Sequence, residues 1–219
     1  MAAIVTCEIT KPYPDRQTEG IVTLNTEFSQ MADPHFDPSK SLEDDEIAVM
    51  RMLERLIKIG KVVDTESLCI IAGEKVWSIR IDVRILNNEG NVLDCACIAA
   101  MAALKNFKRP EVSVSGEEVT VYSVEEKNPV PLAILYIPVC ISFACFNIDD
   151  LEILLMDPSL LEEKIAAGSM TICINSHKEI CAISKPGGVE LSSDAFLQSC
   201  KLAALEAYKI IEILNSHSK

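Results

Sequence analysis

The clearest pattern in the chain reads Trp77-Ser78-Ile79-Arg80-Ile81-Asp82-Val83-Arg84-Ile85. Apolar and polar residues alternate strictly along it. Because successive side chains of a strand point to opposite faces, this alternation predicts a β-strand with one buried face and one polar face. The polar face is expected to meet either water or a partner.

The residues on either side of this strand continue the pattern. The apolar run Leu68–Ala72 predicts a buried strand before it, and Asn87 to Gly90 predict a turn after it. The segment Asn91–Asn106 is apolar almost all round and rich in alanine, which is typical of a helix enclosed between two layers.

The remaining apolar runs predict further strands and two more helices. We expect strands over residues 2–9, 21–28, 112–114, 119–122, 133–137, 139–146, 151–156, 170–174 and 179–184, and a loop over 31–41. One helix should run from about Glu46 to Gly60. Another should begin near Asp194 and present Leu197, Cys200, Ala204, Ala207, Ile211 and Leu214 on one face.

This order of elements predicts an α/β (α+β) fold in which sheets sandwich buried helices. The chain has 219 residues, of which 49% are hydrophobic, enough for a sizeable core. No Gly/Ser-rich linker divides it, so we expect a single domain over residues 1–219, with a first half of about 1–125 and a second of about 126–219.

The charge balance limits how the chain can meet nucleic acid. It holds 20 Lys and Arg against 33 Asp and Glu, a formal net charge of -13. This charge repels phosphate backbones at long range. Any RNA contact must therefore be local, or be supplied by a basic partner.

The nine cysteines point to a reduced, metal-free protein. No two of them form a Cys-x-x-Cys pair, and most lie inside apolar runs, so buried thiols are expected and no metal or cofactor is predicted. Reduced thiols favour the nucleus or cytosol. The longest apolar run, Cys95–Leu104, is ten residues, about half of what a bilayer crossing needs, so no membrane association is expected.

Few residues suit catalysis. The three histidines, His35, His177 and His217, lie in predicted loops or near the chain end, and surface roles suit them best. The acids Asp157, Glu162 and Glu163 are close enough in sequence to hold a divalent metal or act as a general acid. In a chain this acidic, a solvated loop is the simpler explanation of the same spacing.

The basic residues of the first predicted helix are more informative. Arg51 and Arg55 are four residues apart and Lys58 follows by three, so all three are expected on one helix face. Such a stripe could grip successive phosphates. The alternative is a solvated face on which Glu54 pairs with Lys58.

Many short segments together resemble the RNase PH-type ring subunits of the RNA exosome, of the polymyositis/scleroderma autoantigen type. They run in order from about Cys7 to the last helix, over nearly the whole chain. They include Thr18-Glu19-Gly20, Glu27-Phe28-Ser29-Gln30-Met31-Ala32, Asp64-Thr65-Glu66-Ser67-Leu68-Cys69, Ala72-Gly73-Glu74-Lys75-Val76-Trp77, Gly90-Asn91, Arg109-Pro110, Pro129-Val130-Pro131-Leu132 and Ser142-Phe143-Ala144.

The resemblance implies an RNase PH-like fold and a place in a six-membered ring. In that ring, a subunit of this type forms a heterodimer with another RNase PH-like subunit, cap subunits bind the ring, and single-stranded RNA threads the central channel. It implies the nucleus, including the nucleolus, and the cytoplasm as locations. Two channel arginines of archaeal relatives match Arg51 and Arg55, which favours an RNA-contacting stripe of Arg51, Arg55 and Lys58.

The same resemblance implies that the chain has no catalytic site. Active members open the buried helix with Gly-Ser/Thr-Arg to hold phosphate, whereas this chain has Val92-Leu93-Asp94, so phosphate binding is expected to be lost at Asp94. The paired catalytic aspartates match Asp157 and Glu163, expected as vestiges. Two alternatives stay open: a phosphate-dependent 3′-5′ exoribonuclease that uses Asp157 and Glu163, and a purely structural scaffold.

One departure from the family concerns the beginning of the chain. Family members usually carry a further N-terminal segment with early strands, and this chain aligns from about the third strand. We therefore expect a fold that lacks the usual N-terminal strands and exposes a sheet edge, which would invite pairing with a partner.

Overall fold

A computed structural model describes residues 1–29, 31–32, 44–115, 118–123, 125–148 and 151–217. The two acids that open the first helix, Asp44 and Asp45, are described only in their backbone. Most of the expected loop over residues 31–41 lies outside the described residues, and so does His35.

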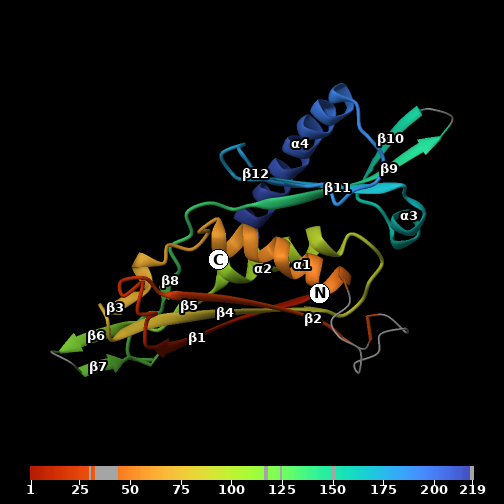
Figure 1. Ribbon diagram of the computed structural model, residues 1–219. Coiled ribbons are helices and arrows are strands. Elements are labelled where there is room, and N and C mark those ends of the chain that lie inside the picture. Colours follow the sequence, from red (N-terminus) through yellow and green to blue (C-terminus); the bar gives the residue numbers. More distant parts are fainter. Residues whose placement is uncertain (30, 33–43, 116–117, 124, 149–150, 218–219) are drawn as a thin grey trace.

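The elements stack in four layers, sheet, helices, sheet and helix, as Figure 1 shows. The first sheet holds β1 (Ala2–Thr10), β2 (Ile21–Phe28), β3 (Cys69–Ile71) and β4 (Lys75–Ile85). The second holds β9 (Val139–Ile148), β10 (Leu151–Met156), β11 (Gly168–Ile174) and β12 (Ile180–Ser184). Helices α1 (Asp44–Glu54) and α2 (Val92–Asn106) lie between the sheets, and α4 (Ser193–His217) covers the outer face of the second.

Strand β4 is the centre of the first sheet, whose order is β1-β4-β2 with β3 also paired to β4. It runs antiparallel to β1 and parallel to β2, so this sheet is mixed. Ile79, Ile81, Val83 and Ile85 are fully buried, while Arg80 and Arg84 are exposed. The half-buried strand predicted from the alternation is therefore confirmed.

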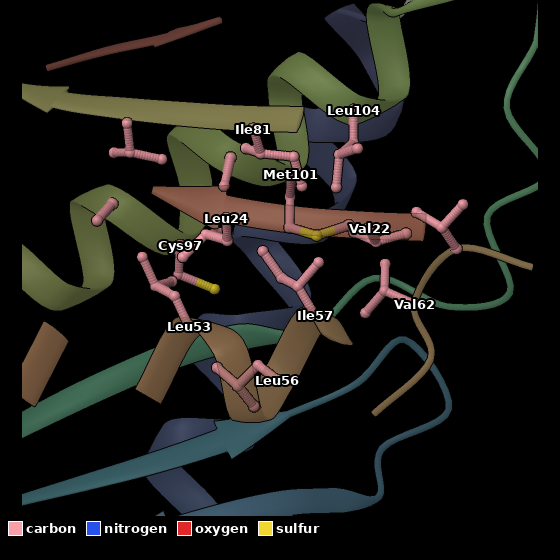
Figure 2. Close-up of a cluster of buried hydrophobic side chains, with 14 of the residues drawn as sticks. Val22, Leu24, Leu53, Leu56, Ile57, Val62, Ile81, Cys97, Met101 and Leu104 are labelled. Carbon is pink, nitrogen blue, oxygen red and sulfur yellow. The ribbon is translucent and has the colours of Figure 1, made fainter. Parts of the chain in front are cut away.

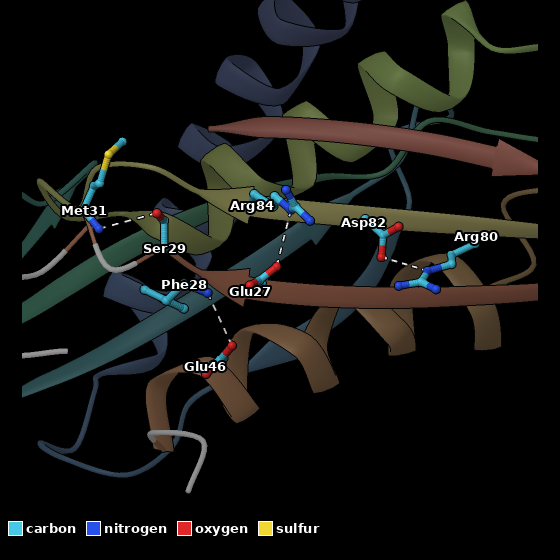
Figure 3. Close-up of polar contacts among 8 residues, drawn as sticks. All are labelled: Glu27, Phe28, Ser29, Met31, Glu46, Arg80, Asp82 and Arg84. Atoms are coloured by element: carbon cyan, nitrogen blue, oxygen red, sulfur yellow. Dashed lines mark hydrogen bonds and ion pairs between the residues drawn. The ribbon is translucent and has the colours of Figure 1, made fainter. Parts of the chain in front are cut away.

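Two arginines on the outer face of β4 form ion pairs (Figure 3). Arg80 Nε lies 3.0 Å from Oδ1 of Asp82 on the same strand, and Arg84 Nε lies 3.3 Å from Oε2 of Glu27, its register partner on β2. Both arginines are thus balanced by neighbouring carboxylates.

The second sheet is antiparallel throughout, in the order β10-β9-β11-β12. Both faces of β9 are covered, because α2 packs on one side and α4 on the other. Phe143 faces the α4 side with Met170 and Ile172, whereas Cys140 and Cys173 face the side of α2. This double coverage explains why β9 reads as a nearly continuous apolar run.

The larger core cluster draws on both halves of the chain. Leu53, Leu56 and Ile57 from the first helical segment belong to one cluster with Met101 and Leu104 of α2 (Figure 2). Cys140, Cys173 and Leu214 from the second half belong to the same cluster. The enclosed helix predicted over residues 91–106 is therefore confirmed.

Short elements complete the chain. They are the π-helix Arg55–Ile59, the 3-10 turn Glu66–Leu68, β5 (Lys108–Arg109), β6 (Val112–Ser115), β7 (Glu118–Val121), β8 (Val130–Pro131) and α3 (Leu160–Ile165). Strands β5 and β8 pair with each other, as do β6 and β7. No helix of the described residues is long and apolar enough to cross a bilayer.

Four sequence expectations were wrong. Residues 133–137 form no strand, because only Ile134 bridges to Val63. The loop expected around the acids after Asp157 contains α3 instead. Leu197 is 56% exposed rather than buried in the α4 face, whose buried residues include Ala203, Ala207 and Ile211. Cys95 and Cys181 are exposed thiols, although Cys97, Cys140, Cys145 and Cys173 are buried.

Candidate functional site

The start of α2 forms a close junction with the loop before α3. Gly90 has a φ of +103°, and a Cβ there would lie 2.4 Å from the backbone nitrogen of Leu160, so no larger residue fits. Leu160 donates its N–H to the carbonyl of Glu89 at 2.8 Å. This contact brings α3 and the end of β10 against the helix N-terminus.

Asp94 is a buried carboxylate in the first turn of α2, with 6% of its surface exposed. Its Oδ2 accepts the Ser142 N–H at 2.7 Å, and its Oδ1 accepts the Ser142 hydroxyl at 2.8 Å. The Ser142 hydroxyl lies 3.0 Å from that of Thr171, its register partner on β11, which can donate to it in turn. Both oxygens of Asp94 are therefore already bonded by the protein.

Opposing influences act on the pKa of the Asp94 carboxyl group. Burial is the largest influence and raises the pKa of its carboxyl group, and the nearby Asp157 adds to this. Hydrogen bonds from Ser142 and Asn91 act to lower that pKa. Within the described residues, neither Asp94 nor Asp157 forms an ion pair with a lysine or arginine.

Asn91 connects the two acids that the sequence singled out as possible catalytic residues. It has a left-handed backbone with a φ of 47°, a conformation that asparagine tolerates. Its Nδ2 donates to Asp157 Oδ1 at 2.7 Å, and its backbone N–H donates to Glu163 Oε1 at 2.9 Å. The structure thus brings Asp94, Asp157 and Glu163 together around one residue.

The third acid of that stretch has a local role. Glu162 accepts hydrogen bonds from the N–H and hydroxyl of Ser159, both at 2.7 Å, and completes a capping box at the start of α3. These bonds lower the pKa of the Glu162 carboxyl group. Across the described parts of the chain, no group of three or more His, Cys, Asp or Glu side chains has the arrangement of a metal site.

Sequence reasoning assigned no role to Asn91, Ser142 or Thr171. Ser142 and Thr171 are polar residues inside the apolar strands β9 and β11, and a polar residue at a buried position needs a hydrogen-bond partner. These two polar positions could therefore be recognised from the sequence. Their shared partner could not, because Asp94 lies 48 positions before Ser142.

The basic stripe lies on the opposite side of the first helix from its buried residues. Arg51, Arg55 and Lys58 are all exposed, as expected, while Leu53 and Leu56 point into the core. The helix becomes a π-helix at Arg55, where Gly60 donates its N–H to the Arg55 carbonyl at 3.0 Å. Since a π-helix places more residues in each turn, Lys58 does not follow Arg55 at the α-helical angle assumed from the sequence.

The three basic residues differ in their partners. Lys58 Nζ lies 3.9 Å from Glu54 Oε1, the pairing that the sequence offered as an alternative. Arg51 and Arg55 form no ion pair within the part of the chain that the structure describes. Two adjacent exposed guanidinium groups are therefore available to an anion.

Comparison with known proteins identifies relatives of both halves. Residues 1–110 match the 3′ exoribonuclease family, domain 1, and residues 136–205 match its domain 2. Exosome complex component RRP45 of Bos taurus is 47% identical over 210 residues, which cover 96% of this chain and 47% of that protein. The chain thus spans about half the length of this relative.

A fungal relative and two solved structures extend the comparison. Exosome complex component rrp45 of Schizosaccharomyces pombe is 43% identical over 212 residues, covering 97% of this chain and 72% of that protein. The Archaeoglobus fulgidus exosome with RNA bound to the active site contains a chain with 28% identity and a TM-score of 0.79, covering 96% of this chain and 77% of that one. A chain of an archaeal exosome core has 26% identity and a TM-score of 0.73, with coverages of 97% and 76%.

The matched families confirm the resemblance drawn from the short sequence segments, and the solved structures confirm the RNase PH-like fold. The chain belongs to the 3′ exoribonuclease family and carries both of its RNase PH domains.

Proposed function

We propose that the chain is a ring subunit of an RNA exosome, which contacts single-stranded RNA and assists 3′-5′ RNA processing and degradation without catalysing it. The observation that carries the proposal is the pair Arg51 and Arg55. In a chain with a net charge of -13, both are exposed and neither has a carboxylate partner among the described residues. The relatives named exosome complex components supply the context.

The chemistry around Asp94 supports the proposed absence of catalysis. A phosphorolytic enzyme must seat a phosphate anion next to the RNA end, and a nearby carboxylate repels it. Here the oxygens of Asp94 accept two hydrogen bonds from Ser142, and Asn91, which could otherwise donate to an anion, is bonded to Asp157 and Glu163. The donors of Asn91 and Ser142 are thus already used.

An activity assay tests the proposal that the chain does not catalyse RNA degradation. The complex that co-purifies with the chain is incubated with RNA and inorganic phosphate, first as the wild type and then with Asp157→Ala. We expect any release of nucleoside diphosphates to be the same in both. Release that disappears in the variant would establish the phosphate-dependent exoribonuclease that uses Asp157 and Glu163.

An RNA crosslinking assay tests the contact itself. In the same complex, Arg51→Glu combined with Arg55→Glu should remove most crosslinks between RNA and this chain, because each charge reversal replaces attraction to phosphate with repulsion. Unchanged crosslinking would favour the purely structural scaffold.

We further propose that this chain forms a heterodimer with another RNase PH-like subunit inside a six-membered ring bound by cap subunits, in the nucleus, nucleolus and cytoplasm. The support is the resemblance to exosome ring subunits and the names of the relatives and solved neighbours. Mass spectrometry of the proteins that co-purify with the tagged chain from nuclear and cytoplasmic fractions tests both points.

A further inference from the structure

The π-helical turn Arg55–Ile59 ends the first helical segment and carries one of the two unpaired arginines. The side chain of Arg55 is exposed and forms no ion pair within the described residues, so its direction depends on the backbone of this turn. The last carbonyl groups of a helix have no partner within the helix, and helix ends fray unless other groups bond to them. The contacts made to this turn therefore determine how firmly Arg55 is held.

Two successive hydrogen bonds connect Tyr136 to the backbone of Arg55. The Tyr136 hydroxyl donates to the Gly60 carbonyl at 2.5 Å, and the Gly60 N–H donates to the Arg55 carbonyl at 3.0 Å. The second bond spans five residues, which is the pattern of a π-helix. Tyr136 thus provides a donor to the carbonyl that follows this helix, from 76 positions further along the chain.

Gly60 permits this contact because it has no side chain. A Cβ at this position would lie 2.5 Å from the Tyr136 hydroxyl oxygen and 2.3 Å from the Leu56 carbonyl oxygen. The φ of Gly60 is −66°, a value that any residue adopts, so the close approach and not backbone freedom requires the glycine. The end of the helix and Tyr136 are therefore in direct contact.

The backbone before Tyr136 restrains the chain that leaves the helix. The Leu135 N–H donates to the Val62 carbonyl at 2.8 Å, and the Asp64 N–H donates to the Ala133 carbonyl at 2.9 Å. The segment that ends at Tyr136 thus runs beside the residues that follow Gly60, and it holds them with backbone bonds as well as with the hydroxyl.

The side chain of Tyr136 suits this role chemically. Its ring is partly buried and packs against the larger core cluster, to which Leu56 and Ile57 of the same turn belong. Burial is the largest influence on the hydroxyl and raises its pKa, so the hydroxyl keeps its proton for donation at neutral pH. Both the ring and the hydroxyl of Tyr136 therefore act on the turn that carries Arg55.

We propose that Tyr136 is a positioning residue for RNA binding, whose hydroxyl holds the last turn of the helix so that Arg55 keeps the direction in which it contacts an RNA phosphate. The inference rests on the RNA-contacting role proposed above for Arg51 and Arg55. Tyr136 lies within residues 136–205, which match domain 2 of the family, whereas Arg55 lies within domain 1. A side chain of one domain thus supports the RNA-contacting surface of the other.

Hydrogen exchange tests the structural half of the proposal without RNA. Tyr136→Phe keeps the ring in the core and removes only the hydroxyl. In the complex that co-purifies with the chain, we expect the backbone amides of residues 59–62 to exchange about fivefold faster in this variant, the factor that one hydrogen bond of ordinary strength contributes. The matched control is Tyr122→Phe, which removes a half-buried hydroxyl that lies 2.9 Å from the Ser113 hydroxyl and should leave this exchange unchanged.

Binding of a single-stranded RNA to the same complex tests the positioning. Arg55→Ala should lower the slope of log affinity against log salt by about 0.7, the contribution of one phosphate contact. Tyr136→Phe should lower this slope in the same direction and weaken binding by up to about fivefold, whereas Tyr122→Phe should change neither. A purely structural role would not alter the salt slope of the folded complex.

A double variant tests whether Tyr136 acts through Arg55. Tyr136→Phe combined with Arg55→Ala should bind RNA as Arg55→Ala alone does, because the hydroxyl then has no arginine left to position. An equal loss of affinity from Tyr136→Phe with and without Arg55 would mean that Tyr136 affects RNA binding by another route, and would overturn the proposal.

Three further results would also overturn it. Unchanged exchange in Tyr136→Phe would mean that the hydroxyl does not hold the turn. An unchanged salt slope in Tyr136→Phe, with a lowered slope in Arg55→Ala, would mean that the arginine needs no support from Tyr136, while the RNA contact itself stands. An unchanged slope in Arg55→Ala would remove the RNA contact of this arginine, and the positioning role with it.

Discussion

The acid cluster at the start of α2 and the basic stripe of Arg51, Arg55 and Lys58 were both expected, from the resemblance, to match functional positions, but they differ in how their charges are satisfied. Asp94 accepts two hydrogen bonds from Ser142, and Asp157 accepts one from Asn91. Arg51 and Arg55 have no carboxylate partner within the described residues.

This contrast indicates that internal hydrogen bonds can prevent ligand binding at a site that keeps its acidic residues. At the acid cluster, a ligand would have to displace short bonds in a buried environment, where leaving a donor unpaired is costly. At the stripe, RNA phosphates would not have to break any ion pair of Arg51 or Arg55 with a described residue. We therefore expect mutations in the acid cluster to change stability, and mutations in the stripe to change binding.

The largest expected effect is a loss of stability on Asp94→Ala. The variant leaves the Ser142 N–H and hydroxyl without their acceptor in a buried site, which should lower the free energy of unfolding by about 3 kcal/mol. Urea unfolding of the chain, followed by the fluorescence of Trp77, measures it. Trp77 is the single tryptophan and is buried in β4.

Two comparisons sharpen this prediction. Asp94→Asn keeps an oxygen that can accept from Ser142 and should lose clearly less stability than Asp94→Ala. Asp82→Ala removes a surface partner of Arg80 and should change stability by about 0.5 kcal/mol or less. Equal losses for Asp94→Ala and Asp82→Ala would show that the acid cluster is not closed by its hydrogen bonds.

The next effect concerns the salt dependence of RNA binding. Each phosphate contact that is removed should reduce the slope of log affinity against log salt by about 0.7 for single-stranded RNA, so Arg51→Ala with Arg55→Ala should reduce it by about 1.4. Binding of a single-stranded RNA to the assembled complex at several salt concentrations measures the slope. An unchanged slope together with a lower affinity would mean that the arginines act without touching phosphate.

A smaller effect on RNA binding is expected from a second pair of arginines, which has the same spacing as Arg51 and Arg55 but has carboxylate partners. Arg80 and Arg84 are also exposed and four residues apart, yet Asp82 and Glu27 neutralise them (Figure 3). Arg80→Ala with Arg84→Ala should leave the salt slope of RNA binding unchanged and alter the free energy of unfolding by about 0.5 kcal/mol for each pair. A slope that falls as far as in the stripe variant would remove the distinction between paired and unpaired arginines.

Periodicity alone predicted the architecture, because its longest elements have strong patterns. The alternation around Ile81 and the apolar length of α2 each allow one interpretation only. Predictions from weaker patterns were wrong at positions where packing determines whether a side chain is exposed. Leu197 repeats at the same helical spacing as the buried residues of α4, but a small rotation of the helix exposes it, and sequence spacing does not encode that rotation.

The candidate site was predictable in its residues but not in its bonds. Arg51, Arg55, Asp94, Asp157 and Glu163 could be named from the resemblance. The helix that carries Glu163 has six residues, too few for a periodic pattern, although the Ser159 and Glu162 capping box was a readable signal. The contacts of Asn91 with Asp157 and Glu163 span 66 and 72 positions and arise only when β10 and α3 pack against α2.

The smallest expected effect is a pH dependence that separates the buried cluster from the exposed stripe. Burial raises the pKa of Asp94 above its ordinary value of 3.8. Between the ordinary and the raised pKa, the folded chain binds more protons at this site than the unfolded chain. The contribution of Asp94 to the free energy of unfolding should therefore be largest below pH 3.8 and should fall as the pH rises through the raised pKa, staying constant above it.

Asp94→Asn cannot titrate, so the difference between wild type and this variant should change in that window alone. Urea midpoints from about pH 3.5 to pH 7 measure it. A difference that grows in favour of the wild type as the pH rises would mean that the bonds from Ser142 outweigh burial, and that the carboxylate is held in its charged form.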